Sequence, residues 1–434
     1  EPMRKLPEEL AKIDELLDDP ALLQPFKEAH PSRRGRPTVP VETYLRLMYL
    51  KHRYNLGYET LVQEVSDSLT WRRFCRIDLD AKVPDSTTLI KARQRYGDRL
   101  TDRLNEALLL SLKEKQVLKT RKLRIDTTVV ESDVHHPTDA SLLQDGVRVM
   151  TRLMRQARKV ASHAVQDFQD RTAEVKKQIL SMAKLLRRRT QQSWEDIDAI
   201  TQTVAGIAEE VCTQVERAVE AIRDRGQSKK QALKAKLAEA ASRTRRLIAQ
   251  AKEVVSGNRV VPDRIVSFFD PEARPIKKGK LGKTVEFGYK LRVDETENGF
   301  ITGHELYVGN PADDELLIPA IDQHIKRYGH APNAVAVDRG FGSRANEAAA
   351  SALGVRRISL PRRGKKGRQR TEYEKQLWFQ DLQRFRAAGE AKISLLKRKY
   401  GLSRSRYRGF VGSKTWVGYG IWVHNLRRAA LMVK

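Results

Sequence analysis

The segment "RKLRIDTTVVES", residues 121–132, decides the fold because the hydrophobic period changes there. Apolar residues recur at helical spacing before it, whereas within it they alternate with polar ones. Leu123, Ile125 and Val129 fall on one face of the predicted strand, and Asp126 falls on the other. A charged group inside a strand costs free energy unless it is solvated or paired. Asp126 is therefore either an exposed edge residue or a ligand, and Glu131 and Asp133 are weaker rivals at the strand's end.

A sequence pattern typical of β-strands returns far downstream. Residues 285–309, "VEFGYKLRVDETENGFITGHELYVG", alternate on both sides of an Asn-Gly pair, which predicts a β-hairpin. A helix is expected next, from about Asp313 to Tyr328, with Asp313 or Asp314 as its cap.

Two further strands and a helix complete this half of the chain. "AVAVDRGFG", residues 334–342, predicts a short buried strand that ends on Asp338, and "RRISLP", residues 356–361, predicts another. The following helix carries Glu390 beside Gly389, a poor helix former that indicates a close approach of another backbone or of a ligand. The order of elements predicts an α/β fold with a mixed sheet that is interrupted once.

The interruption is a long helical segment. Residues 145–258 contain no proline, and an apolar stripe at three-and-four spacing favours a coiled hairpin or bundle. The stripe comprises Ile197, Ile200, Val204, Ile207, Val211, Val215 and Ile222. It suits packing within one chain as well as it suits a dimer.

Four segments are therefore expected. Residues 1–118 form a helical N-terminal region that binds DNA, residues 119–144 begin the α/β core, residues 145–258 are the helical insertion, and residues 259–434 complete the core with basic C-terminal helices. In the first segment, a helix capped by Asp85 or Ser86 carries Lys91, Arg93 and Arg95. That helix suits a DNA groove, although a solvated basic face explains the pattern equally well.

Composition identifies the partner class. The 434 residues include 83 lysines and arginines against 55 aspartates and glutamates, a formal charge of +28 that points to a polyanion. No apolar run of about 18 residues occurs, so a membrane-spanning protein is not expected, and we expect an intracellular one. The two cysteines, Cys75 and Cys212, are far apart, so any metal is expected to have oxygen ligands.

Asp126, Asp338 and Glu390 are the candidate ligands. Each has an ordinary alternative explanation: an edge residue, a turn cap, and half of a surface ion pair with Arg386. Together they are more informative, because converging carboxylates repel one another unless divalent cations such as Mg²⁺ or Mn²⁺ neutralise them. Two such ions support an in-line displacement at phosphorus.

At these residues the sequence resembles the DDE transposases of bacterial insertion sequences. The resemblance rests on "LRIDTTVVES", "VAVDRGFGS" and "RAAGEAKISLLK", which hold Asp126, Asp338 and Glu390 in the family's order. Arg386, Glu390 and Lys397 also match the spacing of the Tyr-Arg-Glu-Lys signature of one large group, with Gln383 at the tyrosine position.

The resemblance implies a ribonuclease-H-like core over residues 120–430, in which the three carboxylates bind two Mg²⁺ ions, with Mn²⁺ as a substitute. It further implies cleavage of double-stranded DNA at element ends, strand transfer into target DNA, and a homodimer that holds two ends. The expected location is the cytoplasm, with the nucleoid. The residues expected to contact DNA are Arg386, Lys397, Arg398, Arg404, Arg406, Arg408, Arg362, Arg363, Lys365, Lys91, Arg93 and Arg95.

Two other functions remain open at this stage. A non-enzymatic architectural DNA-binding protein would use the same charge and would place the three carboxylates apart or in solvent. A metal-dependent nuclease without strand transfer would share the whole site. His135, His136 and His304 are weak candidates as ligands or groove residues, and Trp416 and Trp422 predict a C-terminal helix that closes the core.

Overall fold

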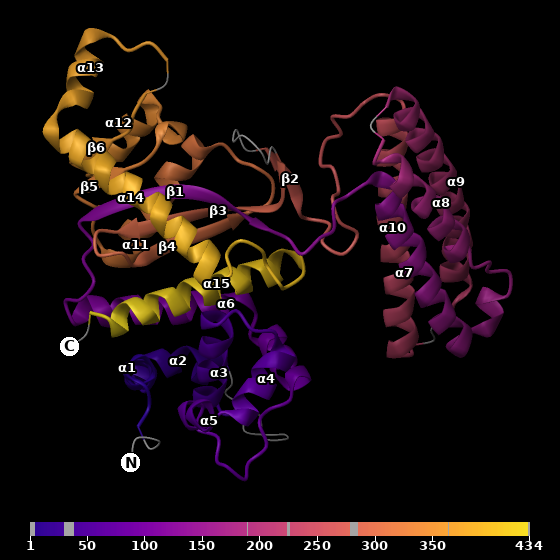
Figure 1. Cartoon of the computed structure of the whole chain (residues 1–434), viewed down its shortest axis with the longest axis horizontal. Helices are drawn as coiled ribbons and strands as arrows, with labels where there is room; N and C mark the ends of the chain where they lie inside the picture. Colours follow the sequence, from indigo (N-terminus) through magenta and orange to yellow (C-terminus); the bar gives the residue numbers. More distant parts are fainter. Residues whose placement is uncertain are drawn as a thin grey trace. The chain divides into compact units, whose positions relative to one another are not determined.

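The computed structural model describes residues 5–29, 39–188, 190–223, 226–277, 285–362 and 364–432. The chain forms two compact units. One unit combines residues 1–133 with 276–434, and the other comprises residues 134–275. Each unit has its own apolar core, and Figure 1 labels the helices and strands of both units.

The first unit contains a mixed sheet. Among the described residues, it has six strands in the order β2-β3-β1-β5-β6, with β4 paired to β3. β1 is antiparallel to β3 and parallel to β5, and β5 is parallel to β6. Their bounds are β1 Lys122–Glu131, β2 Arg274–Lys277, β3 Val285–Thr296, β4 Ile301–Tyr307, β5 Ala334–Ala336 and β6 Arg357–Ser359. This topology confirms the predicted α/β, ribonuclease-H-like fold, and β3 with β4 confirms the predicted hairpin.

Helices cover both faces of the sheet. Leu123 and Ile125 of β1 pack with Val335 of β5 against α11 (Leu317–Tyr328) and α12 (Arg344–Ala352). The alternate residues Ala334 and Ala336 pack against α14 (Leu377–Lys399). Because side chains alternate along a strand, the two faces of β1 and β5 meet different helices.

The N-terminal helices pack on the C-terminal helix. α15 (Gly409–Ala430) lies against α6 (Ser86–Glu114) and α3 (Val41–Arg53), and the Tyr44 and Tyr419 hydroxyls are 3.2 Å apart. Asp85 caps α6 by accepting from the Thr87 N–H, as predicted. The remaining helices here are α1 Glu8–Leu17, α2 Pro20–Ala29, α4 Tyr58–Asp67, α5 Leu69–Phe74 and α13 Arg368–Lys375. None of the helices in the described ranges is long and apolar enough to cross a membrane.

The second unit consists of helices around a separate apolar core. Its main helices are α7 Asp139–Val160, α8 Thr172–Leu185, α9 Gln191–Ala221 and α10 Ser228–Val255. The stripe predicted from sequence supplies that core: Val204, Ile207, Val211, Val215 and Ile222 are buried, and Ile200 packs beside them. The unit spans residues 134–275, and its first helix begins at Asp139, whereas the pattern placed the insertion at 145–258.

Candidate active site

The sheet register brings two of the candidate carboxylates together. Leu123 pairs with Val335 and Arg124 with Ala336 across the parallel strands β1 and β5. Asp126 lies two residues after Arg124, and Asp338 lies two residues after Ala336. Both are on the sheet face that α14 covers. Parallel strands in register thus place both carboxylates at the same edge, outside the carboxyl end of β5.

Glu390 comes to the same place from α14, which packs across β1, β5 and β6. Asp126, Asp338 and Glu390 line one cleft of about 770 Å³, and Arg386 lines it with them. The Glu390 side chain is 72 % exposed, and its Oε1 atom lies 3.4 Å from Nη2 of Arg386. The ion pair expected as the ordinary alternative therefore exists, and it lies within the cleft.

The electrostatics of Asp126 reflect its neighbours. Burial, together with the carboxylates of Asp338 and Glu390, raises the pKa of Asp126 from an ordinary value of 3.8 to about 6. The Thr127 N–H, which donates to Asp126 at 2.8 Å, and the Arg386 guanidinium act in the opposite direction. Negative charge at this position is therefore only partly compensated by the protein.

Asp313 is a fourth carboxylate in the cleft. We expected it, or Asp314, to cap the helix that follows, and that prediction is wrong: neither the 3-10 turn Asp313–Leu316 nor α11 has a side-chain cap. Asp313 Oδ1 instead lies 2.7 Å from Lys290 Nζ and accepts a hydrogen bond from the Thr127 hydroxyl at 2.9 Å. The sequence around Asp313 has the pattern of a helix cap, but the partners of its side chain are Lys290 of β3 and Thr127 of β1.

Gly340 lies close to the side chains of both Asp313 and Asp338. A Cβ atom built on Gly340 would be 2.7 Å from Asp313 Oδ2 and 2.8 Å from Asp338 Oδ1, both too close. Asp338 also caps the short turn after β5 by accepting from the Gly340 N–H at 2.6 Å. Asp338 is therefore a turn cap and a cleft residue at once, and a larger residue at position 340 would require the carboxylates of Asp313 and Asp338 to shift.

A buried charge cluster fixes α14 on the sheet. Arg124 of β1 donates to Glu295 of β3 at 2.8 Å and to the Phe385 carbonyl at 2.5 Å. Lys392, two residues after Glu390, lies 3.4 Å from the same Glu295. Gly389 packs on the Arg124 side chain, 3.4 Å from where its own Cβ would be. The close neighbour indicated by Gly389 is therefore a side chain, not a backbone or a ligand.

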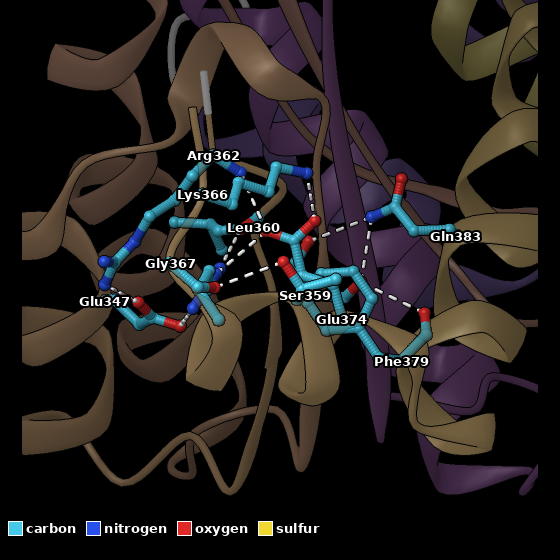
Figure 2. Close-up of polar contacts among 11 residues, drawn as sticks. Glu347, Ser359, Leu360, Arg362, Lys366, Gly367, Glu374, Phe379 and Gln383 are labelled. Atoms are coloured by element: carbon cyan, nitrogen blue, oxygen red, sulfur yellow. Dashed lines mark hydrogen bonds and ion pairs between the residues drawn. The ribbon is translucent and has the colours of Figure 1, made fainter. Parts of the chain in front are cut away.

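Gln383 stands where the signature group has tyrosine. Figure 2 shows its amide directed at the ends of β5 and β6. Nε2 donates to the carbonyls of Val337 at 3.2 Å and Ser359 at 3.1 Å, and it lies 2.8 Å from the Ser359 hydroxyl. Val337 directly precedes Asp338, so Gln383 links the helix of Glu390 to the strand end of Asp338.

The basic loop after β6 is partly organised by carboxylates. Arg362 Nη2 lies 3.0 Å from Glu347, and Glu374 accepts from the Arg362 N–H at 3.1 Å and from Lys366 (Figure 2). Arg370 bridges both carboxylates, at 2.7 Å from Glu347 and 2.8 Å from Glu374. Lys365 is exposed, and the predicted DNA contact Arg363 lies outside the described residues.

The other predicted DNA contacts have different surroundings. Lys397 and Arg398 lie on α14 beyond Glu390, and Lys91 and Arg95 are exposed on α6. The Arg93 guanidinium lies 4.0 Å from the centre of the Tyr407 ring, and Arg404 pairs with Glu131 at 3.2 Å. Arg406 and Arg408 are exposed in the segment before α15.

Several weaker candidates have structural partners. Glu131 forms an ion pair with Arg404, and Asp133 is exposed. His304 lies 3.3 Å from Asp102, and His135 lies 3.3 Å from the Ser141 hydroxyl. Trp416 and Trp422 are 1 % and 0 % exposed, so they close the core as predicted and offer no surface for base stacking.

The cleft residues have the chemistry of a hard-cation site. Their oxygen donors, the raised pKa of Asp126 and the absence of a thiolate nearby suit a divalent ion of the Mg²⁺ or Mn²⁺ kind. As arranged, no three His, Cys, Asp or Glu side chains in the described ranges lie close enough to enclose one. The donor set fits, and the carboxylates would have to draw together around an ion.

Comparison with known families adds two matches. Residues 1–95 match a family described as a transposase domain (DUF772), and residues 272–426 match one described as a transposase DDE domain. Asp338 and Glu390 lie within the second match, whereas Asp126 and residues 134–271 of the helical unit lie in neither. No solved structure matches the chain significantly.

Proposed function

The chain belongs to the insertion-sequence DDE transposases, and on that premise we propose that it cuts DNA at the ends of its element and joins the freed 3′ ends to target DNA. Asp126, Asp338 and Glu390 are the proposed catalytic residues. One observation carries this assignment: carboxylates from β1, the end of β5 and α14 line a single cleft.

The same carboxylates are the proposed metal ligands. Two Mg²⁺ ions, with Mn²⁺ as the substitute, would be held by Asp126, Asp338 and Glu390, with Asp313 beside them. Bound divalent cations activate the attacking oxygen and stabilise the leaving oxygen in a displacement at phosphorus. The pKa of Asp126, raised by burial and by neighbouring carboxylates, supports this proposal because a cation would relieve that repulsion.

Cations around the cleft have separate proposed roles. Arg386 restrains Glu390 in the absence of DNA and contacts the phosphate beside the scissile bond when DNA is bound. Lys397, two turns further along α14, contacts the next phosphates. Lys290 neutralises Asp313, and both residues line the same cleft. These contacts increase the affinity for DNA and orient it, but they do not recognise its sequence. In this proposal the N-terminal helices recognise the sequence.

The proposed assembly is a homodimer on double-stranded DNA that holds two element ends, acting in the cytoplasm on nucleoid DNA. The architectural alternative predicts carboxylates that lie apart or face solvent. The shared cleft of Asp126, Asp338 and Glu390 favours the catalytic proposal, whereas the 72 % exposure of the Glu390 side chain also fits the alternative. A nuclease without strand transfer would have the same cleft, so only the joining step separates it from a transposase.

Substituting Glu390→Gln tests the proposed chemistry. We expect cleavage of a labelled duplex carrying the element's ends, with Mg²⁺ or Mn²⁺, to fall by roughly 100-fold or more, because an anionic oxygen donor is lost while the side chain keeps its shape. DNA binding, measured in parallel, should persist.

Glu372→Gln is the matched control, since Glu372 is an exposed carboxylate that pairs with Lys375. It should cut and join like the unaltered protein. Tight binding by the unaltered protein with neither cutting nor joining in either metal would favour the architectural function. Cutting without joining would favour the nuclease.

A further inference from the structure

The helices of the unit of residues 134–275 differ in charge. α9 carries seven carboxylates and one cation, Arg217. α7 and α10 together carry thirteen cations and four carboxylates. The thirteen are Arg148, Arg152, Arg155, Arg158, Lys159, Lys229, Lys230, Lys234, Lys236, Arg243, Arg245, Arg246 and Lys252. The unit's positive charge is therefore concentrated on one pair of helices.

These two helices enclose a groove of about 260 Å³, which we name the α7–α10 groove. Arg152 and Gln156 line it from α7, and Lys236 and Arg243 line it from α10. Its base includes Leu153 and Phe268, which are both buried. Cations thus stand on both sides of a hollow with an apolar floor.

The carboxylates near the groove are already neutralised. Glu239 pairs with Arg243 at 2.5 Å, and Arg243 also donates to the Phe268 carbonyl at 2.7 Å. Within the described part of the chain, Arg152 and Lys236 are exposed and have no hydrogen-bond or ion-pair partner. Uncompensated cations facing each other across a hollow repel, and an anion between them would relieve that repulsion.

The positive charge continues beyond the groove. Gln250 of α10 donates to Asp139 of α7 at 2.7 Å, so the two helices run antiparallel and the end of α7 lies beside the start of α10. Lys159 lies two turns after Arg152 on the same face of α7, and Lys229 lies two turns before Lys236 on the same face of α10. A row longer than the hollow suits a linear polyanion better than a small anion.

From this arrangement we infer that the α7–α10 groove is a second DNA-binding surface, which contacts the sugar–phosphate backbone of duplex DNA independently of its sequence. The inference rests on the proposed function only for the identity of the polyanion. The apolar residues in the floor of the groove are buried by the helices of the unit, so they cannot insert between base pairs. The groove therefore offers DNA only its positive charge. Contacts of this kind add affinity that falls as salt concentration rises.

The test compares two doubly substituted full-length proteins. Arg152→Gln with Lys236→Gln removes two cations from the groove. Lys176→Gln with Arg217→Gln removes two exposed cations from α8 and α9, so both proteins lose equal charge. Binding to a labelled end duplex and to a random-sequence duplex is measured by fluorescence anisotropy over a range of KCl concentrations.

For the protein with Arg152→Gln and Lys236→Gln, the groove protein, we expect the slope of log affinity against log salt to become shallower by about 1.8 on both duplexes. Each lost phosphate contact should contribute about 0.9 to that change. The control should keep the slope of the unaltered protein. A conservative pair, Arg152→Lys with Lys236→Arg, should keep it as well, which separates lost charge from altered folding.

An unchanged slope in the groove protein, or an equal change in the control, would overturn the inference. A change restricted to the end duplex would also overturn it, because backbone contacts do not distinguish sequences. Metal-dependent cutting by the unaltered protein is measured in the same samples. Failure of the proposed function would remove that cutting, while failure of the groove proposal would leave it intact.

Discussion

At the scale of single residues, Asp126 shows how a proposed catalytic residue can destabilise the fold that holds it. Burial and the carboxylates of Asp338 and Glu390 raise its pKa to about 6. The folded protein therefore holds a proton more tightly than the unfolded chain does, and stability is lost as pH rises from about 4 to 6. Above pH 6 the full cost, roughly 3 kcal/mol, remains.

Asp126→Asn should therefore stabilise the metal-free protein while abolishing cleavage. At pH 7.5 we expect a free energy of unfolding higher by roughly 1–3 kcal/mol, measured by urea denaturation, because the buried charge is gone. The difference should shrink as pH falls toward 4. Asp133→Asn, at an exposed position, serves as the control and should change neither property. A pH-independent difference would contradict the assignment of the raised pKa to Asp126.

Single residues also show which features of the cleft could be predicted from the sequence and which could not. The alternation in β1 correctly placed Leu123 and Ile125 opposite Asp126, since that pattern is local. The role of Asp313 could not be predicted, because Lys290 and Thr127 reach it from other strands, and a capping pattern looks the same with or without them. Local patterns predict faces, whereas contacts across the fold decide between a cap and a cleft residue.

At the scale of elements, the docking of α14 sets the geometry of the cleft. Arg124 and Lys392 hold the helix through Glu295, and Gln383 holds it to the end of β5. The sequence predicted the helix and its charged stripe, but it could not predict these anchors, which involve Glu295 on a strand far along the chain. Glu390 depends on them because it occupies the same helix.

Gln383→Ala should slow cleavage more than it weakens DNA binding. Loss of the amide leaves the Val337 and Ser359 carbonyls without this donor and should cost about 1–2 kcal/mol of stability. We expect roughly a tenfold lower cleavage rate under saturating DNA, because Glu390 and Asp338 are no longer tied together. Gln380→Ala, exposed one turn earlier on α14, is the matched control. A rise in the dissociation constant for DNA with an unchanged rate would argue against a positioning role.

At the scale of the whole molecule, two units have separate cores. The apolar stripe in the sequence predicted the second core, although the pattern could not decide whether it is satisfied within one chain. The structure answers that point: the stripe packs with α7, α8 and α10 of the same chain. Dimerisation through that stripe is therefore not needed to bury it.

Leu237→Ala should loosen the helical unit alone. Leu237 is fully buried in that core, and removing its side chain should cost about 2–5 kcal/mol. In hydrogen exchange of the full chain, peptides from α7, α9 and α10 should lose protection, while peptides from β1 and β3 keep theirs. Leu180→Ala, at an exposed position on α8, should change neither set. Equal loss in both units would show that they unfold together.

The antiparallel pairing of β1 with β3 has a consequence for how the chain folds. Asp126 lies opposite Val293, and the whole helical unit intervenes between these partners in the chain. Closing so long a loop as a random coil is slow, since its entropy must be lost before any contact repays it. Helices form from neighbouring residues and collapse early, which shortens the span that remains to be closed. We therefore expect β1 and β3 to pair after the helices of the insertion have formed, so that the cleft is completed late in folding.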